Sequence, residues 1–177
     1  MSSPTDVRWA VRQRAQWACE FCGVTETDTG GELTIDHFQP HTKGGTDAPE
    51  NLLYCCQRRN QYKADYWPTR PEDPPLWHPR HEPIERHLLL LADGTLYPIT
   101  AVGAFTLRRL RLNRPPLVAY RVRKQGDMAE HRILVHYRDL VAVLEQLHQQ
   151  QVALLEEQRV LLEEQRRLIQ LLLQQHA

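Results

Sequence analysis

The chain has no long apolar run, and this absence argues against a membrane-spanning protein. No stretch of consecutive apolar residues is longer than residues 88–92, whereas a transmembrane helix needs about 20. The N-terminal segment MSSPTDVRWAVRQR also lacks the apolar core of a secretory signal. Only four cysteines are present, and three of them have knuckle-like spacing rather than that of a disulfide framework. We therefore expect a cytoplasmic protein.

A net charge is also missing, which would argue against a nucleic-acid partner if the charges were evenly spread. The 22 Lys/Arg residues balance the 22 Asp/Glu residues, but residues 106–124 contain seven Lys/Arg and no acid. Arginine favours phosphate through its planar guanidinium, so this segment is a candidate for salt-sensitive contact with a nucleic-acid backbone. The alternative is the solvated face of a helix whose apolar side packs on the core. The candidate contacts are Arg108, Arg109, Arg111 and Arg114.

Residues 33–63 begin with the pattern of a strand that carries two polar residues of interest at its end. Leu33 and Ile35 alternate with polar residues, which predicts a half-buried strand. Such a strand would deliver Asp36 and His37 side by side at its end.

A turn and a helix follow this strand. The Lys-Gly-Gly sequence at residues 43–45 predicts a tight reversal, because glycine accepts the positive φ that it needs. The apolar residues 52–54 then lead into residues 56–65, which can form a helix. On that helix Asn60 and Lys63 would lie near each other on one face.

The residue types in this segment suit the hydrolysis of a phosphodiester. Asp36 and Asn60 offer hard oxygen ligands of the kind that Mg²⁺ or Mn²⁺ prefers. His37 can act as a general base near neutral pH. Asn51 can hold the imidazole of His37 through its side-chain amide. A divalent ion with an oriented histidine is sufficient machinery for attack on a phosphate ester.

These residues also follow the motif of a known family. The motif runs C-x-x-C, D-H-x-x-P-x-x-x-G-G, N-L and C-x-x-C-N-x-x-K. The chain carries its elements at Cys19, Cys22, Asp36, His37, Pro40, Gly44, Gly45, Asn51, Leu52, Cys56, Asn60 and Lys63. Residues 5–67 therefore resemble the HNH endonucleases, which have the ββα-metal fold.

The resemblance implies a fold, a substrate, a cofactor and residue roles. It implies an α+β fold with a ββα-metal nuclease core, and DNA as the substrate. The position of Asp36 binds the catalytic Mg²⁺ or Mn²⁺ in this family, and that of Asn60, often a histidine, completes the metal site. His37 takes the place of the general base, and Asn51 that of the residue which orients it. We expect Lys63 either to contact phosphate or to be an ordinary helix-surface lysine.

One position departs from the family motif and leaves a zinc site open to question. The second C-x-x-C of the family reads Cys56-Gln-Arg-Arg59 here, and arginine cannot ligate a metal. Structural zinc takes four Cys or His ligands, and the chain supplies three, namely Cys19, Cys22 and Cys56. The candidates for a fourth are Cys55, His41, His78 and His81. If zinc is not bound, a hydrophobic or hydrogen-bonded substitute must tie the N-terminal helix to the core.

The segments on either side of the motif have ordinary local signals. Residues 5–18 are expected to form a helix with Thr5 as its N-cap, and Trp9 and Trp17 are expected to be core or packing residues because aromatic residues mostly bury. Proline-rich residues 68–83 are expected to form an extended linker.

Beyond the linker, residues 77–81 and 97–115 resemble an extension found after the nuclease core in some bacterial HNH proteins. The predicted elements are a hairpin of residues 86–91 and 95–99 around Asp93-Gly94, a helix over residues 101–112, and a helical or extended piece over residues 117–124 that ends at residues 125–127. His41 is expected to be a surface or phosphate-side histidine.

The C-terminal segment from about residue 132 differs in kind from the rest. The sequence LLEEQR occurs at residues 154–159 and again at 161–166, and leucine recurs every seven residues. Strong helix formers without proline or glycine predict one long helix with a coiled-coil-like stripe. Self-association would cover the leucines, and the alternative is a helix folded back on the middle segment.

Together these features predict three parts: an HNH core at residues 1–67, a basic extension with hairpin and helix at 68–131, and a long helix at 132–177. The predicted function is metal-dependent DNA endonuclease activity, with zinc as a second, structural candidate metal and a homo-oligomer as the expected assembly. The alternative is a nucleic-acid-binding or scaffold protein that keeps the fold with little or no activity.

Overall fold

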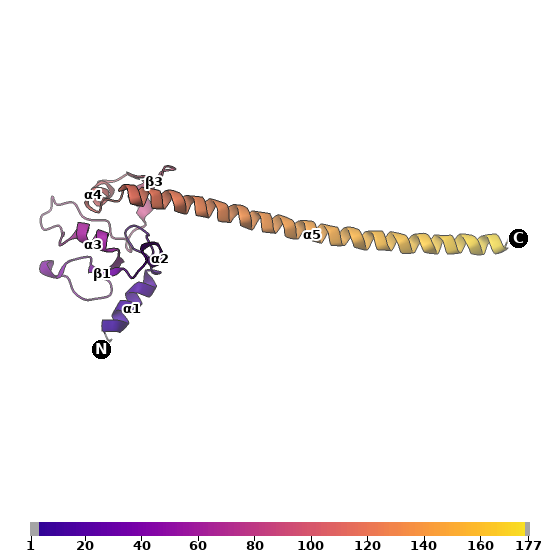
Figure 1. The fold of residues 1–177 in the computed structure, drawn as a ribbon, viewed down its shortest axis with the longest axis horizontal. Coiled ribbons are helices and arrows are strands. Elements are labelled where there is room, and N and C mark those ends of the chain that lie inside the picture. The colour runs from indigo at the N-terminus through magenta and orange to yellow at the C-terminus, as the bar shows by residue number, and fades with distance from the viewer. Residues whose placement is uncertain (1–3, 176–177) are drawn as a thin grey trace. The chain divides into compact units, whose positions relative to one another are not determined.

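A computed structural model describes residues 4–175, and Figure 1 shows its fold. The chain divides into two compact units, one up to residue 125 and one from residue 126 onward. The helices and strands are, in chain order, α1 (Pro4–Arg14), α2 (Glu26–Thr29), β1 (Thr34–His37), β2 (Leu52–Cys55), α3 (Gln57–Lys63), β3 (Leu88–Leu90), β4 (Leu96–Pro98), α4 (Ala101–Arg109) and α5 (Pro115–Gln175), with short 3-10 turns at His41–Lys43 and Ile84–Arg86. Helices and two small antiparallel sheets occur together, so the predicted α+β class is confirmed.

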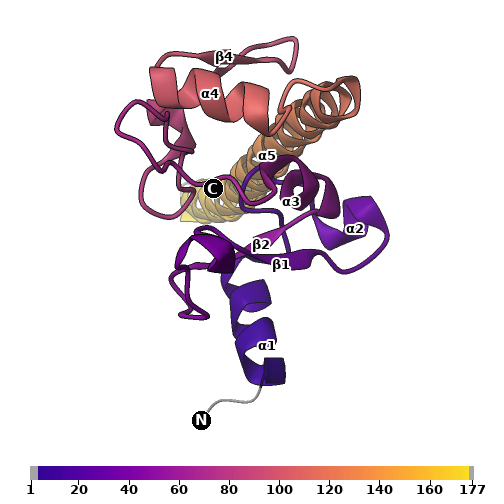
Figure 2. The same cartoon turned by 90° about the vertical axis from the view of Figure 1, so that its left-hand side faces the viewer.

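The sheet of β1 and β2 lies at the centre of the first unit. Its antiparallel register sets Asp36 opposite Leu53 and His37 opposite Leu52. All of β2 is buried, whereas β1 is only partly buried. Because α1 contacts β2 and α3 contacts β1, the sheet lies between these two helices (Figure 2). The predicted strand, turn and helix of this segment are confirmed.

The first helix begins and ends earlier than the sequence predicted. It starts at Pro4, a residue that suits the first helical position because its missing N–H has no helical partner there. Thr5 therefore lies inside the first turn, and its assignment as the N-cap was wrong. The helix ends at Arg14, and Gln16 and Trp17 then take positive φ values of 52° and 55°.

The two tryptophans of this region are not core residues, so the first of the two predicted roles was wrong. Trp9 is 59% exposed and Trp17 is 46% exposed. The core-facing side of α1 carries Val7 and Val11, and Trp9 follows Val7 by two positions, which turns it to the opposite side of a helix. Burial here is decided by the face that meets β2, not by residue type.

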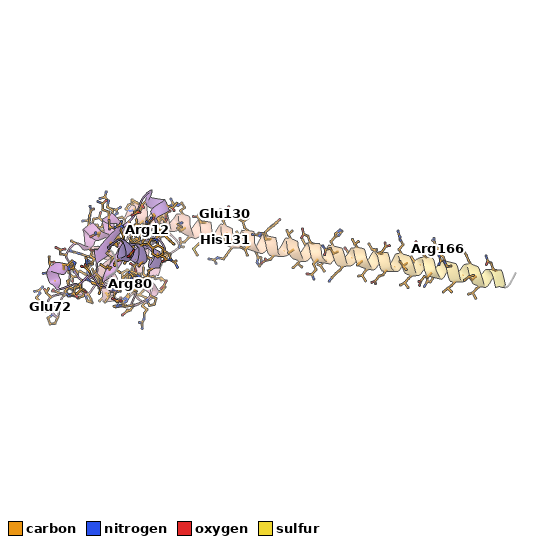
Figure 3. All side chains as sticks on the ribbon, turned by 90° about the horizontal axis from the view of Figure 1, so that it is seen from below. Arg12, Glu72, Arg80, Glu130, His131 and Arg166 are labelled. Atoms are coloured by element: carbon orange, nitrogen blue, oxygen red, sulfur yellow. The ribbon has the colours of Figure 1, made fainter. Side chains whose placement is uncertain are left out.

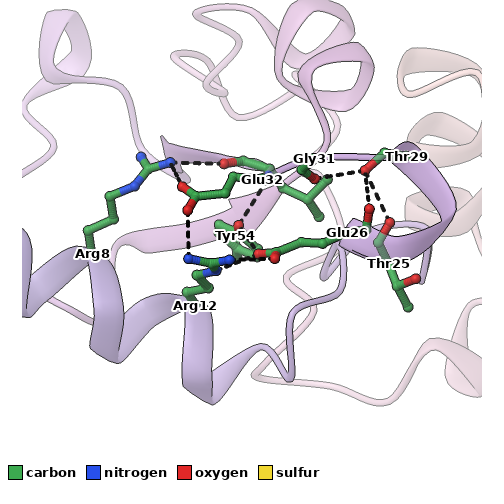
Figure 4. A network of polar contacts seen from close by, with 9 residues as sticks. Arg8, Arg12, Thr25, Glu26, Thr29, Gly31, Glu32 and Tyr54 are labelled. Atoms are coloured by element: carbon green, nitrogen blue, oxygen red, sulfur yellow. Dashed lines mark hydrogen bonds and ion pairs between the residues drawn. The ribbon is translucent and has the colours of Figure 1, made fainter.

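An ion-pair network fastens α1 to α2 and to the sheet (Figure 4). The Arg12 guanidinium donates from Nε and Nη2 to the two carboxylate oxygens of Glu26, each at 2.5 Å. The Tyr54 hydroxyl also donates to Glu26 and accepts from the backbone N–H of Leu33 at 2.9 Å. The Arg12 hydrogen bonds lower the pKa of Glu26, and burial raises that of Tyr54 to about 12. The network is thus a hydrogen-bonded tie between the N-terminal helix and the core.

The proline-rich segment predicted as a linker packs into the first unit. Leu76 and Trp77 are buried, and the backbone N–H of Trp77 donates to the Thr106 hydroxyl on α4 at 2.9 Å. The predicted hairpin is confirmed as β3 and β4, with Gly94 in the left-handed region at φ 79°. The predicted boundary at residues 67 and 68 thus falls inside one compact unit, and the functional division stays a prediction.

The helix α4 is shorter than predicted, and α5 is longer. Arg111 has φ 49°, so α4 ends at Arg109 instead of continuing to residue 112. α5 runs without a break from Pro115 to Gln175, so the break predicted at residues 125–127 was wrong. One glycine in a helix costs only about 1 kcal/mol relative to alanine, which the strong helix formers on both sides outweigh.

The second unit consists of the part of α5 from residue 126 onward, which confirms the predicted long helix as far as Gln175. Its side chains stand out from the helix along its length, as Glu130, His131 and Arg166 do in Figure 3. The leucines of the seven-residue repeat are more than half exposed, namely Leu147, Leu154, Leu161 and Leu168. In residues 4–175, no helix has the length and apolar character to cross a membrane.

Candidate active site

The end of β1 carries Asp36 and His37, and α3 reaches it through a buried lysine. The Lys63 ammonium lies 3.1 Å from Oδ2 of Asp36 and donates to the backbone carbonyl of His37 at 2.6 Å. The Lys63 side chain is 0% exposed. Both expectations for Lys63, a phosphate contact and a helix-surface lysine, were therefore wrong. The residue instead joins α3 to β1. The signal for this role in the sequence was the position of Lys63 on the same helical face as Asn60.

The surroundings of Asp36 suit a divalent cation. Its Oδ2 is buried and accepts no hydrogen bond, although the Lys63 ammonium lies 3.1 Å from it. Burial raises the pKa of Asp36, and the charge of Lys63 opposes that rise. Asn60 precedes Lys63 by three residues on α3, so the two residues are neighbours on one face of this helix. A carboxylate and an amide oxygen are ligands that Mg²⁺ accepts, so these residues fit a catalytic ion.

His37 has a partner that the sequence did not reveal. Its Nε2 lies 2.8 Å from Oδ1 of Asp47, and Nε2 of His41 lies 3.0 Å from the same oxygen. The hydrogen bonds from the two histidines lower the pKa of Asp47. His41 is on the surface, as expected, with 55% of its side chain exposed. Asp47 is ten residues from His37 in a loop, and no local pattern marks it.

Asn51 acts on the loop backbone and not on the imidazole. Its Oδ1 accepts from the N–H of Gln39 at 2.8 Å, and its Nδ2 donates to the carbonyls of Gln39 and Thr46 at 3.0 and 2.8 Å. The sequence-based interpretation that Asn51 holds the His37 ring directly was therefore wrong. Asn51 closes the loop that carries His41 and Asp47. Gly45 permits this closure, since a Cβ there would lie 1.8 Å from the carbonyl oxygen of Gln39.

Three of the cysteines form a cluster with the dimensions of a zinc site. The sulfurs of Cys19, Cys22 and Cys56 all lie within 4.8 Å of one another, and those of Cys22 and Cys56 are 3.8 Å apart. Zn–S bonds of about 2.3 Å in a tetrahedron give a sulfur separation of about 3.8 Å. Hydrogen bonds from the Cys19 and Cys22 thiols, assisted by the charge of Arg59, lower the pKa of Cys56, whereas burial raises that of Cys19 to about 11. Three cysteines that could bind zinc are thus brought together.

None of the four candidates for a fourth ligand joins this cluster within residues 4–175. The sulfur of Cys55 lies 3.8 Å from the Thr34 hydroxyl, so Cys55 points elsewhere, as expected. The rings of His78 and His81 stack on each other with centroids 3.7 Å apart, and His41 contacts Asp47.

The comparisons with known proteins agree with this arrangement. Residues 19–65 match the model of the HNH endonuclease family. The chain carries an HNH domain. The match spans the cysteine cluster, both strands of the first sheet and α3, so the resemblance stated from the motif is confirmed. No curated protein and no solved structure matches the chain.

At the fourth cysteine position of the family, the HNH domain has a buried arginine that bonds to backbone. The Arg59 side chain is fully enclosed, with 1% of the residue exposed. Its Nη1 donates to the carbonyl of Leu110 and, at 3.1 Å, to that of Arg111. Arg59 thereby joins α3 to the turn after α4. The departure from the motif did not predict this contact, because it does not show which distant backbone groups the arginine would meet.

Substitution of this arginine is expected to destabilise the domain. Arg59→Leu leaves two carbonyls without their donor, and a buried acceptor left unpaired costs about 1–3 kcal/mol, so we expect the free energy of unfolding to fall by about 2–4 kcal/mol in urea titrations. Arg58→Leu, at the exposed neighbouring position, is the control and should change it by less than about 0.5 kcal/mol. In Arg59→Cys, which restores the family motif, added Zn²⁺ should recover part of the loss. Equal stability of Arg59→Leu and wild type would contradict a structural role.

Two arginines of the basic segment, Arg111 and Arg114, lie at the ring of Tyr62 on α3 of the HNH domain. The guanidinium of Arg111 lies 4.6 Å from the centre of its ring, and Arg114 donates to its hydroxyl at 2.7 Å, which lowers the pKa of Tyr62. Arg109 donates to the Lys63 carbonyl at 2.9 Å, and Arg108 is exposed. The ion pairs within residues 4–175 include none of these four arginines. They form a basic surface without acidic partners, and its contact with phosphate stays a prediction.

Proposed function

We propose that the HNH domain is a metal-dependent endonuclease that hydrolyses phosphodiester bonds in DNA. The observation that carries the proposal is the junction of β1 and α3. There the Lys63 bridge holds the helical face that bears Asn60 against the strand end that bears Asp36 and His37. An acid, an amide and a histidine on rigid elements are the parts that metal-assisted hydrolysis needs.

In this proposal His37 takes a proton from the attacking water. When its Nε2–H donates to Asp47, the lone pair of the neutral ring is on Nδ1, which can then accept the proton. Asp47 therefore sets the tautomer of His37. Asn51 acts on His37 indirectly, because it fixes the loop that carries Asp47. A Mg²⁺ or Mn²⁺ ion held by Asp36 and Asn60 would stabilise the charge on the phosphate and on the leaving oxygen.

The basic surface supplies the second part of the proposal, which is affinity for the DNA backbone. Arg108 and Arg111 are exposed, so their guanidiniums can reach phosphate. Arg109 and Arg114 are partly engaged with the backbone and with Tyr62, which orients them and lowers the entropy cost of a contact. Such contacts carry no base information and weaken as salt is raised.

A second candidate function is nucleic-acid binding without cleavage. The observation that favours it is the ion pair of Lys63 with Asp36, because the ammonium compensates the carboxylate charge without a metal. In that case the domain would serve as a binding or scaffold module.

The two candidates differ in a plasmid cleavage assay. Supercoiled plasmid is incubated with the full chain and Mg²⁺ or Mn²⁺, and EDTA is added to a parallel sample. The nuclease proposal expects nicked or linear product that requires the metal and disappears with EDTA. DNA binding by well-folded protein without product in either metal would instead support the scaffold function.

We also propose that the second unit joins copies of the chain through its leucine stripe. Leu154 and Leu161 are 59% and 57% exposed, and a second copy would remove this stripe from water. Light scattering coupled to size exclusion is expected to give a mass of two or more chains for the full protein. Leu154→Gln with Leu161→Gln should reduce it to one chain, whereas Glu156→Gln with Glu163→Gln, on the opposite helical face, should not. A monomeric wild type across micromolar concentrations would contradict the proposal.

A further inference from the structure

The loop after β1 gathers three metal-binding side chains that the proposed catalytic ion does not use. They are His37, His41 and Asp47, and one donor atom from each lies within 4.8 Å of the other two. The rings of the two histidines are 4.1 Å apart between centroids. With 55% of His41 and 80% of Asp47 exposed, an ion can enter from solvent.

The hydrogen bond on the far side of His41 shows which nitrogen faces this group. Its Nδ1 lies 2.9 Å from the carbonyl oxygen of Gly45, and a carbonyl can only accept, so Nδ1 carries the proton. In the neutral ring Nε2 then presents a lone pair toward the Asp47 carboxylate, 3.0 Å away. Two acceptors at this distance need a cation between them, which is either the second proton of a charged His41 ring, as in the hydrogen bond to Asp47 described above, or a metal ion. A histidine that donates its other N–H to a backbone carbonyl is also the usual arrangement around a metal.

The spacing of the three donors matches a small transition-metal ion. The nitrogens of His37 and His41 lie 2.8 and 3.0 Å from Oδ1 of Asp47. Zn–N and Zn–O bonds of about 2.0–2.1 Å in a tetrahedron place donors about 3.3 Å apart, so both nitrogen–oxygen separations are within a few tenths of an ångström of the value that a shared ion needs. Two imidazoles and one carboxylate favour Zn²⁺ over Mg²⁺, which prefers oxygen ligands.

We propose that His37, His41 and Asp47 form a binding site for Zn²⁺ or a similar transition-metal ion, separate from the oxygen ligands Asp36 and Asn60. Its effect on cleavage rests on the proposed function. A metal on Nε2 of His37 uses the lone pair there and leaves the ring proton on Nδ1. The ring then has no lone pair with which to accept a proton from water. Zinc at this site therefore inhibits the nuclease, while Mg²⁺ supports it.

Metal binding is tested first with Co²⁺, followed by visible absorption of the full chain. Thiolate-bound Co²⁺ shows sulfur-to-metal charge-transfer bands in the near ultraviolet, which separates the cysteine cluster from an imidazole–carboxylate site. We expect the Co²⁺ titration to contain one phase in which ligand-field bands rise without charge-transfer bands. His41→Ala should weaken this phase at least about 10-fold, and His81→Ala, a matched histidine outside the group, should not. Unchanged Co²⁺ affinity in His41→Ala, or the absence of such a phase in wild type, overturns the proposal.

The inhibitory effect is tested by adding Zn²⁺ to plasmid cleavage in Mg²⁺. Each protein is compared with its own zinc-free rate, and the zinc concentration for half inhibition should rise about 10-fold or more in His41→Ala. Equal inhibition of the two proteins overturns the inhibitory role. If wild type cleaves nothing in either metal, the nuclease proposal fails, and the Co²⁺ measurement alone decides whether the site exists.

Discussion

His37→Ala protein is expected to cleave plasmid about 10²–10⁴-fold more slowly than wild type, the range that a general base contributes. The side chain is the imidazole at the end of β1, where Asp47 holds its Nε2 at 2.8 Å and leaves Nδ1 for water. DNA binding should persist, because the basic surface around Tyr62 does not include His37. The measurements are the initial cleavage rate in Mg²⁺ or Mn²⁺ and a binding isotherm on the same DNA.

The matched control for this prediction is His131→Ala. His131 is exposed on α5 in the second unit (Figure 3), so its loss should leave the cleavage rate within about twofold of wild type. An equal rate in His37→Ala and wild type would rule out His37 as the base. Loss of cleavage together with loss of the folded state, seen by circular dichroism, would call for His37→Asn as the milder variant.

Lys63→Met is expected to lower the free energy of unfolding by about 3–5 kcal/mol, which is the range for breaking a buried ion pair at one partner. The Lys63 side chain is 0% exposed, and that of Asp36 is 14% exposed. Methionine fills similar space but leaves the Asp36 carboxylate without its counter-charge and the His37 carbonyl without its donor. Urea unfolding followed by fluorescence measures the change.

Two further variants separate charge from packing in this prediction. Lys63→Met combined with Asp36→Asn removes both charges and should be more stable than Lys63→Met alone, because no unpaired charge remains in the interior. Lys43→Met, at an exposed position of the loop, should change stability by less than about 0.5 kcal/mol. A loss below about 1 kcal/mol in Lys63→Met would show that Asp36 is solvated or neutral in the folded protein.

Local patterns in the sequence were sufficient to predict the elements of the HNH domain and the hairpin that follows it. Alternation of apolar and polar residues gave the strand that ends at His37, and the glycine at position 44 takes the positive φ of 82° that its turn required. The hairpin at Asp93-Gly94 could be predicted for the same reason, because its turn also needs a glycine with a positive φ. These features depend on neighbours within a few residues, so sequence alone could decide them. The cysteine spacing likewise indicated a cluster that the fold then assembled.

Contacts between distant segments needed the tertiary structure. Asp47 meets His37 because the loop closed by Asn51 folds back on the strand end. Arg59 finds its partners more than fifty residues away, after α4.

The sequence by itself determined which residue types the site holds and the order in which strand, loop and helix present them. Only the tertiary structure decided that Lys63 is buried against Asp36 and that Trp9 is exposed. The physical reason is that spacing along a strand or helix fixes which side chains share a face. Which face is buried, and which charges meet there, depends on the packing of elements that are far apart in the chain.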